Sequence, residues 1–411
     1  MFAVQPLARR LSIRCVRAVV DRDVRLLAQT FAFAVAIAFT LAFAVLACSP
    51  HAGAPAGEVT PAGAVGADNA PVGVTPAGEA VRVELAGERI GKLLPVGGGA
   101  RAETGVGARA GGGGGEAAGA ATGTGEWLWP SIIDSHVHLT YWPVADRLAA
   151  AGIAAAVDLA APEVRVAAPE ARGDGRIRVI SSGPMLTHPG GYPLDSWGSD
   201  GYGIGCADAA AVTAAIDRLA RQGAGVIKLA LDEDGLDPAL VPAAVTAAHA
   251  RRLRVAVHAF SDRSARLAGE AGADLLAHTP VEPLRPETLA AWRGRAVLST
   301  LAAFGGAPTA ISNLRALRAA GAIVLYGTDL GNLREAGPSA AEISLLREAG
   351  LDDAAIVEAM TTAPARYWGL PFGAIAAGDE ASFLVLDRDP RTDATALLSP
   401  REVWLRGRRV R

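Results

Sequence analysis

Cysteine is scarce in this 411-residue chain, which contains only Cys15, Cys48 and Cys206. Two of the three lie in or beside the N-terminal segment, so the body of the chain cannot carry a disulfide framework. Cys206 is expected to be a small packed apolar residue, because free cysteine is among the residue types most often buried. The sequence therefore excludes the class of small secreted domains that depend on several disulfides.

The chain also lacks the basic surface that nucleic-acid-binding proteins need. Its formal net charge is −3, with 39 basic against 42 acidic residues, and this balance includes an Arg-rich N-terminal stretch between Arg9 and Arg25. Because binding to nucleic acid needs a basic patch or stripe on the folded domain, nucleic acid is excluded as a partner. Half of the residues (51%) are apolar, so a chain of this length can bury one large core and still carry a smaller domain.

The N-terminal segment has the pattern of a secretory signal. An Arg-rich stretch precedes the run from Phe31 to Ala47, in which Thr40 is the only polar residue, as in the n-region and h-region of a signal peptide. The run ends in Val-Leu-Ala-Cys-Ser around Cys48, which resembles the lipobox of bacterial lipoproteins. Residues 1–47 are therefore predicted to be a lipoprotein-type signal peptide. The chain is expected to be exported and tethered to a membrane of the bacterial cell envelope through a lipidated Cys48. The alternative is an apolar run that stays in the membrane as an uncleaved anchor.

Two tracts are too poor in large apolar residues to bury a core. Residues 48–78 are rich in Ala, Gly and Pro, and residues 96–125 include the glycine run Gly111–Gly115. Such a composition cannot offset the entropy lost on ordering, so the first tract is predicted to be a flexible tether and the second a Gly/Ala-rich insertion. The segments 79–95 and 371–411 contain alternating strand patterns, and we expect them to pair into a small composite β-sandwich domain.

Between these segments, residues 126–370 alternate short apolar runs with Ala-rich helical patterns. This alternation predicts an α/β fold with a parallel sheet and crossover helices. Helical spacing is clear at Val212, Ile216 and Leu219, which share one face before Gly223 ends the helix. The eight apolar runs begin at Ile132, Ala154, Ile177, Val226, Val255, Leu275, Val297 and Ile323. Eight strand–helix units in this length predict a (β/α)8 TIM barrel.

Candidate metal ligands lie at the ends of these runs. His136 and His138 are two residues apart on an extended segment, so their side chains point to the same side and can hold one ion. His258 and His278 end the fifth and sixth runs, and Asp329 follows the eighth. Because the active sites of such barrels are assembled at the C-terminal ends of the strands, we expect these five side chains to meet at one site.

The segment from Ile133 to Leu139, Ile-Asp-Ser-His-Val-His-Leu, resembles the first-strand signature of the amidohydrolase superfamily, in particular its imidazolonepropionase-like and prolidase-like branch. Residues 363–370 and 373–381 are similar to the passage from barrel to small β-domain in that family. The resemblance covers residues 80 to 411. It implies two divalent metals, the first bound by the histidines of the first strand and the aspartate of the eighth, the second by the histidines of the fifth and sixth strands. It also implies a carbamylated lysine that bridges the metals. At the matching positions stand His136, His138, Asp329, His258, His278 and Lys228.

Lysine is strongly avoided in this chain, in which only Lys92 and Lys228 are lysine and all other basic residues are arginine. Lys228 lies in the apolar run Val226–Leu231, where an unpaired buried ammonium would be costly. Burial lowers the pKa of an amine, and a neutral amine can react with carbon dioxide, whereas a guanidinium stays protonated. The alternative for Lys228 is an ion pair with a nearby carboxylate.

A long loop after the third run carries three aromatic residues in an aromatic-poor protein, Tyr192, Trp197 and Tyr202. We expect this loop to cover the substrate. Tyr192 is a candidate substrate-binding residue. His188 either contacts the substrate as well or caps the loop.

These residues predict hydrolysis of an amide, peptide or cyclic amide C–N bond in a small-molecule or dipeptide-like substrate. In the expected mechanism, metal-activated water attacks the carbonyl, and Asp329 takes the proton and passes it to the leaving nitrogen. Zinc is the leading metal because imidazole ligands suit it. Two alternatives stay open: a mononuclear deaminase-like site that does not use Lys228, and a lipoprotein that binds a ligand without catalysis.

Overall fold

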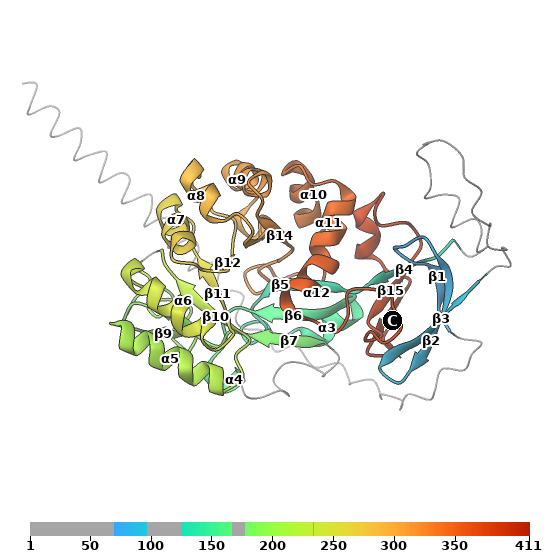
Figure 1. The fold of residues 1–411 in the computed structure, drawn as a ribbon, viewed down its shortest axis with the longest axis horizontal. Helices are drawn as coiled ribbons and strands as arrows, with labels where there is room; N and C mark the ends of the chain where they lie inside the picture. Colours follow the sequence, from blue (N-terminus) through green and yellow to red (C-terminus); the bar gives the residue numbers. More distant parts are fainter. Residues whose placement is uncertain (1–69, 97–124, 167–176, 233) are drawn as a thin grey trace, which may run out of the picture. The chain divides into compact units, whose positions relative to one another are not determined.

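The computed structural model describes residues 70–96, 125–166, 177–232 and 234–411 (Figure 1). The chain divides into two units, Met1–Pro61 and Ala62–Arg411, and all described residues belong to the second. The predicted signal peptide, Cys48, most of the predicted tether and nearly all of the predicted Gly/Ala-rich insertion lie outside the described residues. Within the described ranges, no helix is both long and apolar enough to cross a membrane.

All eight predicted apolar runs form strands, and these strands pair in parallel. The first three form one sheet, which consists of β5 (Ile132–Val137), β6 (Ile153–Asp158) and β7 (Arg178–Ser181). The other five are neighbours in chain order in a seven-stranded sheet, namely β10 (Val226–Ala230), β11 (Arg254–His258), β12 (Leu275–Leu276), β13 (Ala296–Leu298) and β14 (Ile323–Leu325). Beside β10, the same sheet continues with two strands that the sequence did not predict, β8 (Met185–Thr187) and β9 (Gly203–Gly205). The predicted α/β fold with a parallel sheet is confirmed.

Backbone hydrogen bonds also connect the two parallel sheets. The Gly225 N–H, just before β10, donates to the carbonyl of Ser181 in β7 at 2.9 Å. The Ser135 N–H of β5 donates to the carbonyl of Tyr326, just after β14, at 3.0 Å. The first predicted strand therefore lies beside the last. Every residue of β5, β6 and β10 is buried, which explains why these strands are continuous apolar runs rather than alternating ones.

Helices connect the strands, and Figure 1 shows α5 to α10 outside the parallel strands. Helix α5 (Ala209–Arg221) begins after Asp208, whose side chain accepts a hydrogen bond from the Ala211 N–H at 2.8 Å, and it buries the predicted apolar face. Gly223 follows with φ +92°, a conformation that favours glycine and ends the helix. The other α-helices in the described parts of the chain are α3 (Ala145–Ala150), α4 (Glu163–Val166), α6 (Val241–His249), α7 (Asp262–Glu270), α8 (Pro286–Ala291), α9 (Pro308–Ala319), α10 (Ala340–Glu348), α11 (Asp353–Met360) and α12 (Thr362–Trp368).

A mixed sheet is built from both ends of the described chain. Its seven strands run in the order β17, β16, β15, β4, β1, β2, β3. Strand β4 (Trp127–Pro130) pairs antiparallel with β15 (Phe383–Leu386) and parallel with β1 (Val72–Val74). The remaining strands are β2 (Ala80–Ala86), β3 (Arg89–Pro95), β16 (Glu402–Leu405) and β17 (Arg408–Arg409).

The mixed sheet has a small core of its own, in which the rings of Phe383 and Trp404 stack with centroids 5.9 Å apart. Strands from the segments 79–95 and 371–411 lie in this one sheet. The structure differs from the sequence-based description at β1, which lies in the range predicted as tether, and at β4, which lies in the range predicted as barrel. Runs of three and four residues are too short to give a periodic signal. The domain boundaries themselves stay a prediction.

Candidate metal centre

Two histidines project from the end of β5. His136 lies within the strand and His138 one residue beyond it, so both side chains point to the same side, and their ring centroids are 5.1 Å apart. Both are buried, with exposed fractions of 0% and 5%. The His138 N–H donates to the Leu330 carbonyl at 2.6 Å, and the Asp329 N–H donates to the His136 carbonyl at 2.9 Å. The segment after β14 is therefore held against these two histidines.

Asp329 reaches the histidines through a backbone conformation that few non-glycine residues adopt. Its φ is +57°, in the left-handed region. Gly327 and Gly331 allow the close approach, because a Cβ at these positions would lie 3.0 Å and 2.7 Å from the Cβ atoms of His136 and His138, respectively. As a result, Asp329 Oδ1 lies 3.4 Å from His136 Nε2 and 3.0 Å from His138 Nε2.

These three side chains have the arrangement of a metal site. All are buried, and their ligand atoms lie within 4.8 Å of one another. His136 Nδ1 lies 2.8 Å from the Ala277 carbonyl oxygen, so Nδ1 carries the hydrogen and Nε2 presents its lone pair. In the described structure, His136 Nε2 is buried without a hydrogen-bond partner, which is rare for a buried polar atom, and Asp329 Oδ1 faces His138 Nε2 at 3.0 Å. Two imidazoles and one carboxylate fit a divalent metal such as zinc.

His258 and His278 lie beside this cluster. His258 ends β11 and His278 follows β12 by two residues. The ring centroid of His278 is 4.5 Å from that of His136 and 5.0 Å from that of His258. Burial lowers the pKa of His258 to about 3 and lowers the pKa values of His136 and His278 well below the ordinary value. These imidazoles are therefore neutral at neutral pH, which is the form that binds metals.

Lys228 lies in the middle of β10 and is 1% exposed. Burial lowers its pKa to about 7, although the charge of Asp329 acts in the opposite direction. Lys228 lies close enough to the histidines to contribute to the lowered pKa values of His258 and His278. No described carboxylate forms an ion pair or hydrogen bond with its amine. The structure thus gives no support to the alternative in which Lys228 is paired with an acid.

Two further side chains hold the cluster in place. The Asp134 carboxylate accepts hydrogen bonds from the His136 N–H at 3.1 Å, the Thr328 N–H at 3.0 Å and the Thr328 hydroxyl at 2.5 Å. It thereby ties β5 to the segment after β14. Asn332 Nδ2 donates to Asp329 Oδ2 at 2.8 Å, while Oδ1 faces the histidines. Asp134 shares the two-residue spacing of His136 and His138, so its position could have been predicted, but nothing in the sequence pointed to Asn332.

The two predicted substrate-binding residues have different surroundings. The ring centroid of Tyr192 is 5.0 Å from that of His258, and its hydroxyl accepts a hydrogen bond from Trp197 Nε1 at 3.2 Å. His188 is exposed, and its carbonyl accepts the Gly191 N–H at 2.9 Å. Among the described side chains, none at the candidate centre contacts the His188 ring. Of the two residues, only Tyr192 lies at the centre.

Two phenylalanines that sequence reasoning did not assign also lie against the histidines. The ring centroid of Phe260 is 4.4 Å from that of His258, and that of Phe304 is 5.0 Å from that of His278. Phe260 follows His258 by two residues, and that spacing could have indicated it. Phe304 carries no such signal, because its position depends on a loop after β13.

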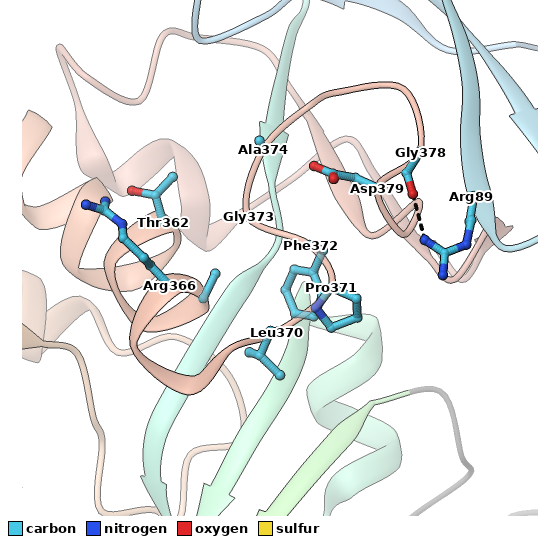
Figure 2. Close-up of a pocket in the computed structure, with 11 residues that line it drawn as sticks. Arg89, Thr362, Arg366, Leu370, Pro371, Phe372, Gly373, Ala374, Gly378 and Asp379 are labelled. Carbon is cyan, nitrogen blue, oxygen red and sulfur yellow. Dashed lines mark hydrogen bonds between the residues drawn. The ribbon is translucent and has the colours of Figure 1, made fainter.

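A separate pocket of about 480 Å³ lies between α12 and the loop around Gly378 (Figure 2). Arg89 and Arg366 lie on opposite sides of it. Arg89 Nη1 donates to the Gly378 carbonyl at 2.6 Å, and Arg366 Nη2 lies 3.4 Å from Glu358 Oε1. None of the candidate metal ligands lines this pocket, so the reaction is not assigned to it.

Sequence comparisons match part of this chain to a known enzyme family. Residues 208–410 match the model of the Amidohydrolase family. Uncharacterized proteins of Mycobacterium tuberculosis and Mycobacterium bovis are each 28% identical to this chain over 327 residues, which cover 69% of this chain and 85% of the relative.

Similar solved structures include a Xaa-Pro dipeptidase with bound methionine in the active site, with a TM-score of 0.64, 16% identity and coverage of 80% of this chain and 94% of that chain. A putative prolidase from Bifidobacterium longum has a TM-score of 0.62 and 21% identity, with coverage of 81% of this chain and 89% of that chain. At these identities the likeness shows a shared fold.

Proposed function

Because residues 208–410 place this chain in the amidohydrolase family, we propose that it is a divalent-metal-dependent hydrolase that cleaves an amide, peptide or cyclic amide bond. The family confirms the resemblance found in the sequence and the predicted class of enzyme, a hydrolase acting on carbon–nitrogen bonds. The observation that carries the metal-dependent part of the proposal is the convergence of His136, His138 and Asp329 in one buried cluster.

The proposed scaffold is a closed (β/α)8 barrel with a small β-sandwich domain made from both ends of the chain. The hydrogen bonds that link β5 to the segment after β14, and β7 to the segment before β10, support closure. The candidate histidines and Asp329 lie at or just beyond the C-terminal ends of parallel strands, where barrel enzymes assemble their active sites.

The proposed centre holds two divalent ions. His136, His138 and Asp329 would hold the first, His258 and His278 the second, and Lys228 would bridge them as a carbamate. A pKa of about 7 leaves a large fraction of the Lys228 amine neutral at neutral pH. The neutral nitrogen forms a bond to the carbon of carbon dioxide and loses a proton, which gives an anion with two oxygens. Zinc is the proposed metal because most of the ligands are imidazoles.

When bound, the ions supply Lewis-acid polarisation of the amide carbonyl and of water. The chain's own residues supply orientation and proton transfer. Asp329 Oδ1 accepts the proton that the attacking water loses and donates it to the leaving nitrogen as the C–N bond breaks. Asn332 holds the other oxygen of Asp329, so the carboxylate keeps one orientation through both transfers.

The proposed substrate is a dipeptide-like or other small molecule. Two of the similar structures are a Xaa-Pro dipeptidase and a putative prolidase, names that favour a small amide or peptide for this chain as well. The buried cluster suits such a substrate better than a folded protein, because the candidate ligands are 5% exposed or less.

A mononuclear, deaminase-like site is the second candidate function. One observation favours it. Among the described residues, a single group of His, Cys, Asp and Glu side chains has ligand atoms close enough together to hold one ion, and this group consists of His136, His138 and Asp329. In that case Lys228 stays an unmodified amine. The two candidates differ in metal stoichiometry, two ions against one.

The test is a hydrolysis screen with the metal-reconstituted protein on dipeptides, acyl-amino acids, lactams and lactones, with bound metal counted by atomic spectroscopy. Turnover of an amide with two ions bound per chain is the expected result. One ion per chain with normal turnover would establish the mononuclear candidate. Binding of amides without turnover in the metal-loaded protein would instead favour the alternative of a protein that binds a ligand without catalysis.

The proposal for localisation rests on the sequence of the N-terminal segment. Signal-peptide cleavage before Cys48 and lipidation of its thiol would tether the enzyme to a membrane of the bacterial cell envelope, and retention of the apolar run as an anchor is the alternative. Mass analysis of the mature N-terminus decides between them.

A further inference from the structure

We infer that the substrate carries an aromatic ring next to the scissile amide bond, and that an aromatic collar around the site histidines selects it. This inference rests on the proposed hydrolase function and names the substrate class for the same site. The aromatic collar consists of Tyr141, Tyr192, Trp197, Phe260 and Phe304.

The collar residues contact the histidines directly. The ring centroids of Trp197 and His138 are 5.6 Å apart, and those of Tyr192 and His258 are 5.0 Å apart. Phe260 contacts both His258 and His278, at 4.4 Å and 5.2 Å. A group bound at the histidines would therefore lie next to aromatic rings from several directions.

The collar residues also contact one another. Trp197 is 5.7 Å from Tyr141 and 6.3 Å from Tyr192, and Phe260 is 4.8 Å from Phe304, between ring centroids. His258 joins the group around Trp197 to the pair of phenylalanines, because its ring contacts both Tyr192 and Phe260. The rings thus form a connected chain rather than isolated contacts.

These rings come from separate parts of the chain. Tyr141 follows β5, Phe260 follows β11, and Phe304 ends the short 3-10 helix Ala302–Phe304 after β13. Tyr192 and Trp197 lie between β8 and β9. All five follow the C-terminal ends of parallel strands, which is where a substrate reaches the ligands. Aromatic residues make up only 5% of the chain, so their gathering at this one edge needs a cause.

None of the collar side chains is fully buried, since all five are of intermediate exposure. Tyr141, Tyr192 and Trp197 pack against a small buried cluster that includes Met185 and Tyr202, yet each keeps part of its surface exposed, unlike the fully buried Trp292 and Tyr326. Partly exposed apolar groups gathered at one place mark sites of interaction, and a ligand site is formed mainly by apolar and aromatic side chains around a few polar groups.

Polar contacts hold the collar in position before any substrate binds. The Asp232 carboxylate accepts hydrogen bonds from the Phe260 N–H and from the Ser261 hydroxyl. The Glu342 carboxylate accepts the N–H groups of Leu301 and Ala302, at the start of the turn that ends in Phe304. Rings fixed in this way lose little freedom when a ligand arrives, which favours binding.

The chemistry of the rings distinguishes an aromatic group from a saturated one of similar size. Aromatic pairs gain attraction from their quadrupoles beyond the effect of buried area, and two or more such contacts correspond to a preference of about tenfold. We therefore expect kcat/KM for a benzoyl amide to exceed that for the matched cyclohexanecarbonyl amide by about tenfold. The same comparison of an anilide with an N-cyclohexyl amide shows whether the ring belongs on the nitrogen side.

The test uses the full chain loaded with zinc, and it has two readouts. The first is the ratio of kcat/KM for the aryl and cyclohexyl substrates in the wild type, Tyr192→Leu, Phe304→Leu and Tyr192→Phe. Leucine at either position should bring the ratio towards one, whereas Tyr192→Phe keeps the ring and should keep the ratio. The second readout is binding of benzamide and cyclohexanecarboxamide followed by tryptophan fluorescence, with Trp197→Phe to identify the responding residue.

The outcomes separate this inference from the proposed function. Turnover with a strong aryl preference that the leucine variants lose supports both. Turnover of aryl and cyclohexyl amides at equal rates overturns the inference and leaves the hydrolase standing. Absence of turnover with preferential binding of benzamide rejects the hydrolase but supports the aromatic selection. Absence of turnover and of any binding preference overturns both.

Discussion

Glu342 shows how a residue away from the metal ligands can control the collar. It lies in the first turn of α10, has an exposed fraction of 0%, and accepts the Leu301 N–H at 3.0 Å and the Ala302 N–H at 2.7 Å. Hydrogen bonds to a charged group contribute about 1.5–3 kcal/mol each. Because burial of a carboxylate costs desolvation energy, its removal offsets part of the stability lost with these two hydrogen bonds. Glu342→Ala should therefore lower the free energy of unfolding by about 2–3 kcal/mol.

Glu342→Gln is the second informative variant, because its amide keeps one acceptor oxygen. We expect it to lower the free energy of unfolding by about 1 kcal/mol. Burial raises the pKa of Glu342 above its ordinary value of 4.5. An acid whose pKa is higher in the folded than in the unfolded protein adds to the free energy of unfolding. This contribution is fully present at pH values below the unfolded-state pKa, and it is lost as the pH rises through the folded-state pKa. The gap between the wild type and Glu342→Gln should therefore widen as pH falls from 8 to 5.

The assay is urea unfolding of the metal-free protein followed by circular dichroism, with Glu348→Gln as the control. Glu348 is exposed on the same helix, so its substitution should change little. In the metal-loaded protein, Glu342→Ala should also reduce the preference for aryl substrates, since the turn that carries Phe304 loses its anchor, while metal content stays at the wild-type level. Equal stability of Glu342→Ala and the control would refute the reasoning.

Four other predictions address the centre and the N-terminus. His136→Ala and His258→Ala should each lose metal and activity with an unchanged circular dichroism spectrum, and wild-type metal content in both would place the site elsewhere. Lys228→Ala and Lys228→Arg should both lose one of two bound ions, and mass spectrometry of the native metal-loaded wild type should show the mass of one added carbon dioxide. Two ions and normal turnover in Lys228→Arg would disprove the bridging role. Chelation should abolish turnover and lower the thermal midpoint, and added zinc should restore both; an unchanged midpoint and rate would argue against a bound metal. In cell fractions, the mature protein should be membrane-bound with Cys48 at its N-terminus, and a soluble form that keeps residues 1–47 would contradict this.

The strands were predictable because burial on both faces leaves a strong signal in the sequence. Each of the eight predicted starts lies within one residue of an observed strand start, as at Ala154, where β6 begins at Ile153. Strands β8 and β9 were missed because three-residue strands inside a long loop carry no periodicity. Their assignment depends on pairing partners that are distant in the sequence.

The site was partly predictable for a related reason. A histidine at the end of an apolar run is placed by the strand itself, so His136 and His258 could be assigned from position alone. Their role as metal ligands stays a prediction. Phe304 and Glu342 could not be found in this way, because Phe304 lies in a turn fixed by a carboxylate from another helix. For His188 the sequence left open a contact with the substrate or a cap of the loop, and in the structure its side chain is exposed while its carbonyl accepts the Gly191 N–H.

The mixed sheet also has a consequence for how the chain is made. Strand β4 is covered on one side by β15, and Trp127 pairs there with Leu386. During synthesis β4 leaves the ribosome long before its partner exists, so its edge stays open until nearly the whole chain has been translated. An open strand edge invites aggregation and proteolysis. A chain truncated before β15 would thus keep this edge of β4 open, and we expect it to aggregate and to be cleaved by proteases more readily than the longer chain.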